Sequence, residues 1–351
     1  MSTNIQHILV AIGTLKRPPT FELRKAAAVA LAAGASVELF HAIEEPDPGA
    51  SYPQTATRQA VERQRAAIVA KSCARLELFA RKVLAGVKTT CTAEWGHAPY
   101  DAIVRRALTT HADLVVAGAR EHRFGARLLL RNTDWELIRH CPVPLLLVKS
   151  SRAYAHPVIM AAVDPFHAHA RPADLDGRLL SAATHFAQLL HGTVHVFHAS
   201  KPLINVEAAS VSAVPVTVLP PEAEEAHREQ IAAVITQLAK SGGVPETRCH
   251  VSIGEVVPEL SAATRRSHAG LVVMGAVSRS AVTRLFIGNT AERALDRLTC
   301  DVLVVKPRGF AAEVTRRISR RAHPSMSAGA LATASPRLRT PIAPVWVPPL
   351  F

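Results

Sequence analysis

Short apolar runs alternate with longer segments of helical periodicity along the first half of the chain. The apolar runs predict five strands, with the sequences HILVAIG, SVELFHAI, KTTCTAEWG, DLVVAGA and PLLLVK. Between them we expect a helix that ends at Gly34, a long helix over 57–85, another near 98–110 and a last one from about 133. Strands that alternate with helices predict a parallel sheet with right-handed crossovers and helices on both faces.

The same order of elements occurs twice. The segment HADLVVAGA at 111–119 matches HAGLVVMGA at 268–276, at an offset of 157 residues. Other segments share this offset: Phe40-His41-Ala42 with Phe197-His198-Ala199, Arg127-Leu128 with Arg284-Leu285, Asn132-Thr133 with Asn289-Thr290, and Val148-Lys149 with Val305-Lys306. Helices are expected in the second half near 175–190, 222–241, 256–268 and 290–299. A common register over separated segments predicts two copies of one domain.

We therefore predict an α/β protein with two tandem, doubly wound, parallel sheets of five strands each, in a Rossmann-like arrangement. The first domain is expected over 1–150, the second over 155–308, and a tail over 309–351. A length of 351 residues suits two domains and an extra segment. A hydrophobic content of 48% with only 5% aromatic residues is typical of helices packed on buried parallel strands.

The formal net charge of +13 raises the question of a nucleic-acid partner. Nearly half of the excess lies from Arg308 to the end of the chain, which holds seven arginines and one acidic residue, Glu313. The rest of the tail is rich in Ala, Ser and Pro and includes Trp346, so we expect it to be disordered beyond a short helix near 311–322. Nucleic acid is therefore an expected partner only through this tail.

The apolar runs and the cysteines indicate the cellular compartment of the protein. No run approaches the roughly 18 apolar residues that a membrane span needs, and the first residues enter a strand pattern without a basic leader. The five cysteines are scattered and form no C-x-x-C pair, which favours reduced thiols over a zinc site or a disulfide framework. These features predict a soluble cytoplasmic protein without a membrane span.

In open sheets of this kind, ligands bind beyond the carboxyl ends of the strands, where the winding reverses. If the first and fourth strands of each copy are neighbours, this crevice is lined by Gly13 and Gly118 in copy one, and by Asp164 and Gly275 in copy two. A loop from a strand into a helix can bind phosphate, because the first N–H groups of the helix lack partners and glycine allows close approach. The alternative for copy two is a simple capped turn, with Asn289 and Glu292 as a capping box.

The loop of copy two resembles the signature G-x2-G-x9-G-[ST] of the universal stress protein family. Gly275 matches the first glycine, Ser278 replaces the second, Gly288 matches the third, and Asn289 followed by Thr290 stands where Ser or Thr is usual. The resemblance covers roughly residues 5–308 and is to the tandem two-domain type. It implies a fold like that of the adenine nucleotide alpha hydrolases, and a loop that holds ATP phosphates in the members that bind nucleotides.

The resemblance also implies two contacts with the nucleoside in copy two. Asp164, at the end of the first strand, matches the aspartate that lies beside the adenosine, and Ala199 matches a small residue that contacts the base. ATP is therefore the expected ligand of copy two. A related small molecule stays open as an alternative.

Copy one departs further from the signature. Gly118 remains, but Glu121 stands at the second glycine, Arg131 at the third, and Gly13 replaces the aspartate; Asn132 and Thr133 follow. A carboxylate repels a triphosphate, and an arginine at the helix entrance fills the volume that phosphates need. We expect copy one to be a degenerate site and a dimer-like partner of copy two within one chain, with a homodimer of chains also possible.

Other chemistry is sparse. The long apolar loop at 201–221 suggests an alternative function, a carrier of an acylated or otherwise apolar ligand. The pairs His167 with His169 and His195 with His198 lack a third ligand, so we assign no metal. No nucleophile and base can be assembled from spacing. We therefore predict a stress-response sensor or interaction protein that binds a ligand and is not an enzyme.

Overall fold

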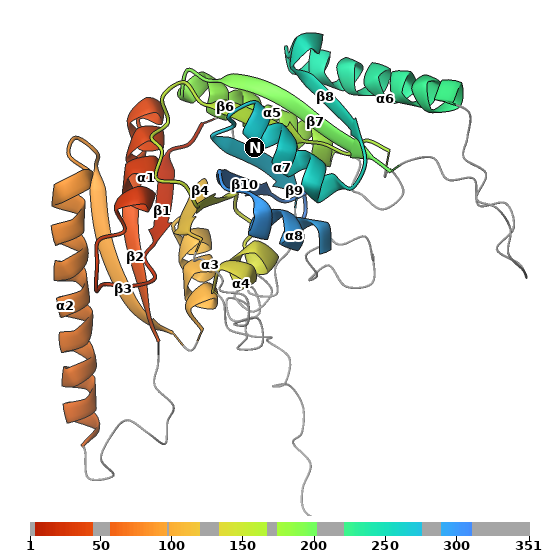
Figure 1. Ribbon diagram of the computed structural model, residues 1–351. Coiled ribbons are helices and arrows are strands. Elements are labelled where there is room, and N and C mark those ends of the chain that lie inside the picture. The colour runs from red at the N-terminus through yellow and green to blue at the C-terminus, as the bar shows by residue number, and fades with distance from the viewer. Residues whose placement is uncertain are drawn as a thin grey trace, which may run out of the picture.

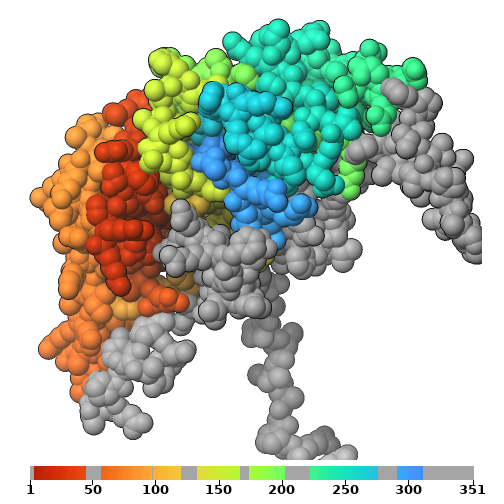
Figure 2. All heavy atoms as spheres, viewed as in Figure 1, coloured from red at the N-terminus to blue at the C-terminus, as the bar shows by residue number. Residues whose placement is uncertain are grey.

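The computed structural model describes residues 4–44, 57–96, 98–119, 133–166, 174–201, 221–275 and 289–310. Two copies of one α/β unit form a single continuous sheet (Figure 1). The space-filling view shows the copies side by side, with the red-to-yellow first copy against the green-to-blue second copy (Figure 2).

The first copy contains five strands and four helices within the described residues. They are β1 (His7–Ala11), α1 (Thr20–Ala33), β2 (Ser36–Glu44), α2 (Arg58–Val83), β3 (Thr89–Gly96), α3 (Pro99–Thr109), β4 (Leu114–Gly118), α4 (Thr133–His140) and β5 (Leu145–Val148). Helix α1 ends at Gly34, whose φ of 66° lies in the left-handed region that glycine adopts readily. Helix α2 begins after Thr57, whose side chain accepts a hydrogen bond from the N–H of Ala60.

The second copy repeats this order. Its elements are β6 (Val158–Ala162), α5 (Leu175–Leu189), β7 (Thr193–Ser200), α6 (Pro221–Ser241), the 3₁₀ helix η2 (Glu246–Arg248), β8 (Cys249–Ile253), α7 (Val256–Arg266), β9 (Leu271–Gly275), α8 (Asn289–Arg297) and β10 (Asp301–Val305). The predicted elements are thus confirmed, with ends that differ by a few residues.

The strand order is β3-β2-β1-β4-β5-β10-β9-β6-β7-β8. All neighbours are parallel except β5 and β10, which pair antiparallel. The predicted parallel five-stranded sheets are therefore confirmed, and β1 lies beside β4 as β6 lies beside β9. The sequence did not indicate that the two sheets join into one of ten strands.

The register at the junction is symmetric. Leu146 pairs with Leu303, its own counterpart at the repeat offset of 157 residues. A two-fold axis through the sheet produces such self-pairing, as in an isologous dimer interface. Because the two halves run in opposite directions, the carboxyl ends of the strands lie at one edge of the sheet in copy one and at the opposite edge in copy two.

Helices cover both faces of the sheet. One hydrophobic core contains residues of α1, α2, α5 and α6, and the other contains residues of α3, α4, α7 and α8. Helices α2 and α6 lie at opposite ends of the sheet, over the last strands of each copy (Figure 1). The strands between these layers are apolar on both faces, as expected for a covered parallel sheet.

A buried carboxylate joins the two copies. Asp301, the first residue of β10, is fully buried, and its Oδ2 lies 2.8 Å from Nζ of Lys25 in α1. The hydroxyl of Tyr154 donates to the same oxygen at 2.8 Å. The N–H groups of Lys149 and Ser150, just after β5, donate to Oδ1 at 2.9 and 2.8 Å. All four partners precede the second copy in sequence.

Lys149 and Lys306 both interact with groups of the opposite copy. Nζ of Lys149 donates to the carbonyls of Leu295 and Leu298 at the end of α8. Lys306, the counterpart of Lys149, is buried, and its charge interacts with Cys141 at the end of α4; burial lowers its pKa to about 8. This reciprocal arrangement repeats the two-fold relation seen in the strand register.

Two histidines that recur in the repeat, His111 and His268, follow α3 and α7. Both adopt left-handed φ angles, 53° and 51°, and the backbone N–H of each donates to a helix carbonyl at 3.3 Å. The backbone of each histidine therefore helps to satisfy the end of its helix.

The cysteines and the helix lengths are two further features of the structure. The five cysteines are free thiols, and burial raises the pKa of Cys141 to about 12. Within the described ranges, none of the helices has the length and apolar character that crossing a bilayer requires.

Candidate functional site

The crevice of copy two lies where the chain leaves β6 toward one face of the sheet and leaves β9 toward the other. Ala161 pairs with Val273 and Ala162 pairs with Phe197, so the three strands end at nearly the same level. This register brings together three of the predicted site residues, which are Asp164, Ala199 and Gly275 at the carboxyl ends of β6, β7 and β9.

Asp164 is half-buried, and its backbone N–H donates to Oδ1 of Asp176 in the first turn of α5 at 3.0 Å. This hydrogen bond fixes the backbone just after β6 against the start of the helix. Ala199 is partly buried and packs against the core on the α7 side. Both residues therefore have defined places in the wall of the crevice.

A histidine behind the crevice explains one of the repeated segments. Nδ1 of His198 lies 3.0 Å from the carbonyl oxygen of Val163, and Nδ1 of His41 lies 2.7 Å from that of Ile12. A carbonyl can only accept, so Nδ1 carries the proton in both rings. In each copy this hydrogen bond connects the second strand to the residue just before Gly13 or Asp164, the position expected to line the crevice.

Phe166 was missed by the sequence reasoning. Its side chain is 48% exposed although it is apolar, and its ring centroid lies 5.3 Å from that of His198. An aromatic residue two positions after Asp164 was the available signal. Its exposed ring offers a flat surface beside His198, close in sequence to Asp164.

Gly275 also has a structural role. A Cβ at this position would lie 2.8 Å from Cδ2 of Leu175 in the first turn of α5. The glycine therefore allows the start of α5 to pack directly on the end of β9. In copy two the contact at this strand end is apolar.

Copy one has an acidic contact at the same place. Glu22, in the first turn of α1, lies against Gly118, and its Oε1 occupies the space that a Cβ would need. A carboxylate here repels phosphate. The sequence reasoning did not single out Glu22, because nothing in its spacing shows that α1 begins over the end of β4.

Several predicted positions lie outside the described residues. They are Ser278 and Gly288 of copy two, Glu121, Arg131 and Asn132 of copy one, His167 and His169, the loop 202–220 and the tail beyond Phe310. Asn289 and Thr290 are the first two residues of α8, and Thr133 is the first of α4. Gly13 is exposed just beyond β1.

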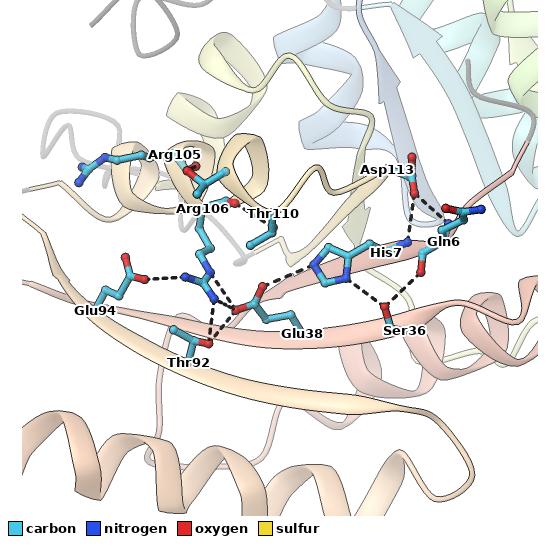
Figure 3. Close-up of polar contacts among 11 residues, drawn as sticks. Gln6, His7, Ser36, Glu38, Thr92, Glu94, Arg105, Arg106, Thr110 and Asp113 are labelled. Atoms are coloured by element: carbon cyan, nitrogen blue, oxygen red, sulfur yellow. Dashed lines mark hydrogen bonds and ion pairs between the residues drawn. The ribbon is translucent and has the colours of Figure 1, made fainter. Parts of the chain in front are cut away.

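A buried polar network lies under α3 of copy one (Figure 3). Glu38 of β2 accepts hydrogen bonds from Thr92 at 2.7 Å and from Nε of Arg106 at 2.9 Å, and its other oxygen lies 3.5 Å from Nε2 of His7. Arg106 also pairs with Glu94 at 3.0 Å. Burial by itself would raise the pKa of Glu38, but the hydrogen bonds outweigh it and hold the pKa at about 2. The network satisfies its own charges, which is typical of a structural cluster.

Copy two has a histidine pair in place of this network. His195 is the counterpart of Glu38, and Ala263 that of Arg106. Nδ1 of His195 lies 2.8 Å from Nε2 of His250, with the rings stacked at 5.1 Å. Burial lowers the pKa of both, and so do the charges of nearby arginines, Arg248 for His195 and Arg266 for His250.

His195 and His198 project from opposite faces of β7 and do not converge on a common ligand. The part of the chain that the structure describes contains no group of three or more His, Cys, Asp or Glu residues placed to hold a metal ion.

Comparisons with known proteins agree with this architecture. A model of the Universal stress protein family matches residues 4–149 and 159–306. Universal stress protein E of Escherichia coli K12 is 31% identical over 270 residues, which are 72% of this chain and 78% of that protein. The Salmonella typhi protein of the same name is 30% identical over the same shares.

Two solved structures share the fold. A functionally unknown protein from Pseudomonas aeruginosa PAO1 has a TM-score of 0.62 at 20% identity, covering 92% of this chain and 99% of its own. A universal stress protein from Archaeoglobus fulgidus has a TM-score of 0.57 at 16% identity, covering 87% of this chain and 98% of its own.

Proposed function

The chain belongs to the universal stress protein family, and from that premise we propose that it is a stress-response binding protein whose second copy takes an ATP-like nucleotide. In this proposal the protein acts in the cytoplasm as a sensor, through ligand-dependent contacts with partners and without turnover of the ligand. The free, scattered cysteines fit a reducing compartment.

One observation carries the assignment to copy two. Asp164, Ala199 and Gly275 lie together at the carboxyl edge, and the residue packed on the glycine is the apolar Leu175. The crevice thus offers the carboxylate of Asp164 for the polar groups of a nucleoside, and the side chain that packs directly on the end of β9 is apolar. Ser278, Gly288, Asn289 and Thr290 would contribute the phosphate-binding part of the same site.

Copy one is proposed to be a degenerate site with a structural role. The carboxylate of Glu22 against Gly118 opposes phosphate binding there. Glu121 and Arg131 are expected from the sequence to disfavour phosphate in the same copy. We propose domains over 1–150 and 155–308, with copy one replacing the second subunit of a dimer. The symmetric pairing of Leu146 with Leu303 supports this interpretation.

Isothermal titration with ATP tests the proposal. We expect heat from the unmodified chain, and a loss of about tenfold to hundredfold in affinity for Asp164→Ala, the range expected when a hydrogen bond to a charged group is removed. Gly288→Arg should abolish binding, because it places in copy two the residue type found at the matching position of copy one. Gly13→Asp, at the position in copy one that matches Asp164, is the control and should leave the affinity unchanged. Absence of ATP binding by the unmodified chain would overturn the proposal.

A further inference from the structure

Two arginines lie close together at the carboxyl edge of copy two. Arg178 is in the second turn of α5, and Arg308 follows β10. Asp174 lies between their charges: its Oδ2 is 3.1 Å from Nε of Arg308, and it also interacts with the charge of Arg178. Two guanidinium groups thus interact with the same carboxylate.

One N–H donor of Arg178 lacks a hydrogen-bond acceptor among the residues that the structure describes. Its Nε is buried, and no residue in the described ranges accepts a hydrogen bond from it. Burial lowers the pKa of Arg178, and the charge of Arg308 adds to this effect against that of Asp174. A buried donor without an acceptor is costly, because its hydration is lost and not replaced. An anion next to Arg178 would supply the missing acceptor.

The arginine pair lies at the end of the strand that leads into the predicted phosphate loop. Leu175, one turn before Arg178, packs on Gly275. Val305, three residues before Arg308, pairs with the same glycine in the sheet register. Both arginines are therefore attached to the wall of the crevice beside the end of β9.

Copy one lacks this pair. At the repeat offset, Phe21 and Ser151 stand where copy two has Arg178 and Arg308. The side chain next to Gly118 is the carboxylate of Glu22. The two copies thus differ in the side chains at matching strand ends, and the pair of arginines is in the copy that keeps two glycines of the family signature.

We propose that Arg178 and Arg308 bind the distal phosphates of a nucleoside polyphosphate in copy two. This inference rests on the proposed nucleotide site and names the residues that select a polyphosphate over a nucleoside. A guanidinium group matches phosphate well, since its N–H donors form paired, charge-assisted hydrogen bonds. The exposed pair of Arg308 with Asp174 is weak enough to be exchanged for such a ligand.

Titration of the full chain with ATP, adenosine and inorganic tripolyphosphate tests the inference. Arg178→Gln should weaken ATP binding about tenfold or more, and Arg308→Gln about threefold to tenfold, because Arg308 is more exposed. Adenosine binding should stay unchanged in both variants. Arg24→Gln, an exposed arginine of α1 in copy one, is the matched control and should behave like the unmodified chain. Circular dichroism checks that each variant is folded.

The outcomes separate this inference from the proposed function. Unchanged ATP affinity in both variants, or an equal loss for ATP and adenosine, would overturn the role of the arginines and leave the nucleotide site standing. If neither ATP nor adenosine binds, the nucleotide site fails; tripolyphosphate binding that both variants weaken would still support the arginine pair. If tripolyphosphate does not bind either, the arginine pair fails as well.

Discussion

Single residues in a shared scaffold decide which ligands each crevice tolerates. Gly118 and Gly275 stand at matching strand ends, yet one contacts the carboxylate of Glu22 and the other the side chain of Leu175. A unit charge a few ångströms from a phosphate acts strongly where water is partly excluded. The contrast arises from the helix that packs on each strand end, because α1 places Glu22 and α5 places Leu175 against the glycine.

A single residue, Glu38, also determines how much its polar network contributes to the stability of the fold. The folded-state pKa of about 2 lies below the ordinary value, so the carboxylate contributes stability above pH 4 that is lost as the pH falls toward 2. We expect Glu38→Gln to lower the free energy of unfolding at pH 7 by up to about 3 kcal/mol. The difference from the unmodified chain should shrink between pH 4.5 and pH 3. Urea unfolding followed by circular dichroism measures both effects.

Glu94→Gln is the control for this prediction. Glu94 pairs with the same Arg106 but its side chain is 43% exposed, so water screens the interaction. Its loss should change stability by less than about 1 kcal/mol. Equal effects of the two substitutions at every pH would contradict the role assigned to Glu38.

At the scale of elements, the sequence predicts much of this fold. Alternating periodicity predicted the order of strands and helices, because it is a local signal. The repeat predicted the two copies, because matching segments recur at a fixed offset. The antiparallel junction of β5 and β10 was not predictable from these signals, because each strand reads as a buried apolar run whatever its neighbour. The family signature indicated Asp164, Ala199 and Gly275, but Arg178, Arg308 and Glu22 depend on helix placement.

The histidine pair shows the same limit. Spacing grouped His195 with His198 on one strand, whereas the structure pairs His195 with His250 from the neighbouring strand β8. Their separation of 55 residues along the chain carries no periodic signal. Only the parallel register of β7 and β8 brings them together.

This pair predicts a pH dependence of stability. Burial lowers the folded-state pKa of both histidines, so the unfolded chain takes up protons first as the pH falls below about 6.5. Stability should therefore decrease from pH 7.5 to pH 5.5. His250→Thr, which introduces the residue type of Thr92 in copy one, should make this decrease smaller. Urea unfolding at pH 7.5, 6.5 and 5.5 measures the slope.

His227→Gln, on the outer helix α6, is the control for the histidine pair and should keep the slope of the unmodified chain. A slope that His250→Thr leaves unchanged would show that the pair does not govern the pH dependence. Loss of stability by the same amount at every pH would lead to the same conclusion.

At the scale of the whole molecule, one continuous sheet and interactions of charged side chains connect the two copies. The junction of β5 and β10 makes the sheet continuous, Lys149 donates to the end of α8 across it, and Lys306 interacts electrostatically with Cys141 of copy one. The crevices lie at opposite edges of this sheet because the halves run antiparallel. A ligand in copy two therefore lies far from the crevice of copy one, and any effect on it must pass through the shared junction.

Substitution of Asp301 tests how strongly this junction holds the two copies together. Removing its carboxylate leaves the buried Lys25 without its charge partner and also removes the acceptor of Tyr154 and of two backbone N–H groups. We expect Asp301→Ala to cost about 3–5 kcal/mol, the range for one partner of a buried ion pair. Because the lost contacts all connect β10 to copy one, unfolding should change from one transition to two, as seen by calorimetry and urea titration. Glu225→Ala, an exposed carboxylate of α6, should cost less than about 0.5 kcal/mol. A single transition with a similarly small change for Asp301→Ala would mean that the other contacts across the junction, such as the strand pairing and the bonds of Lys149, suffice to hold the copies together.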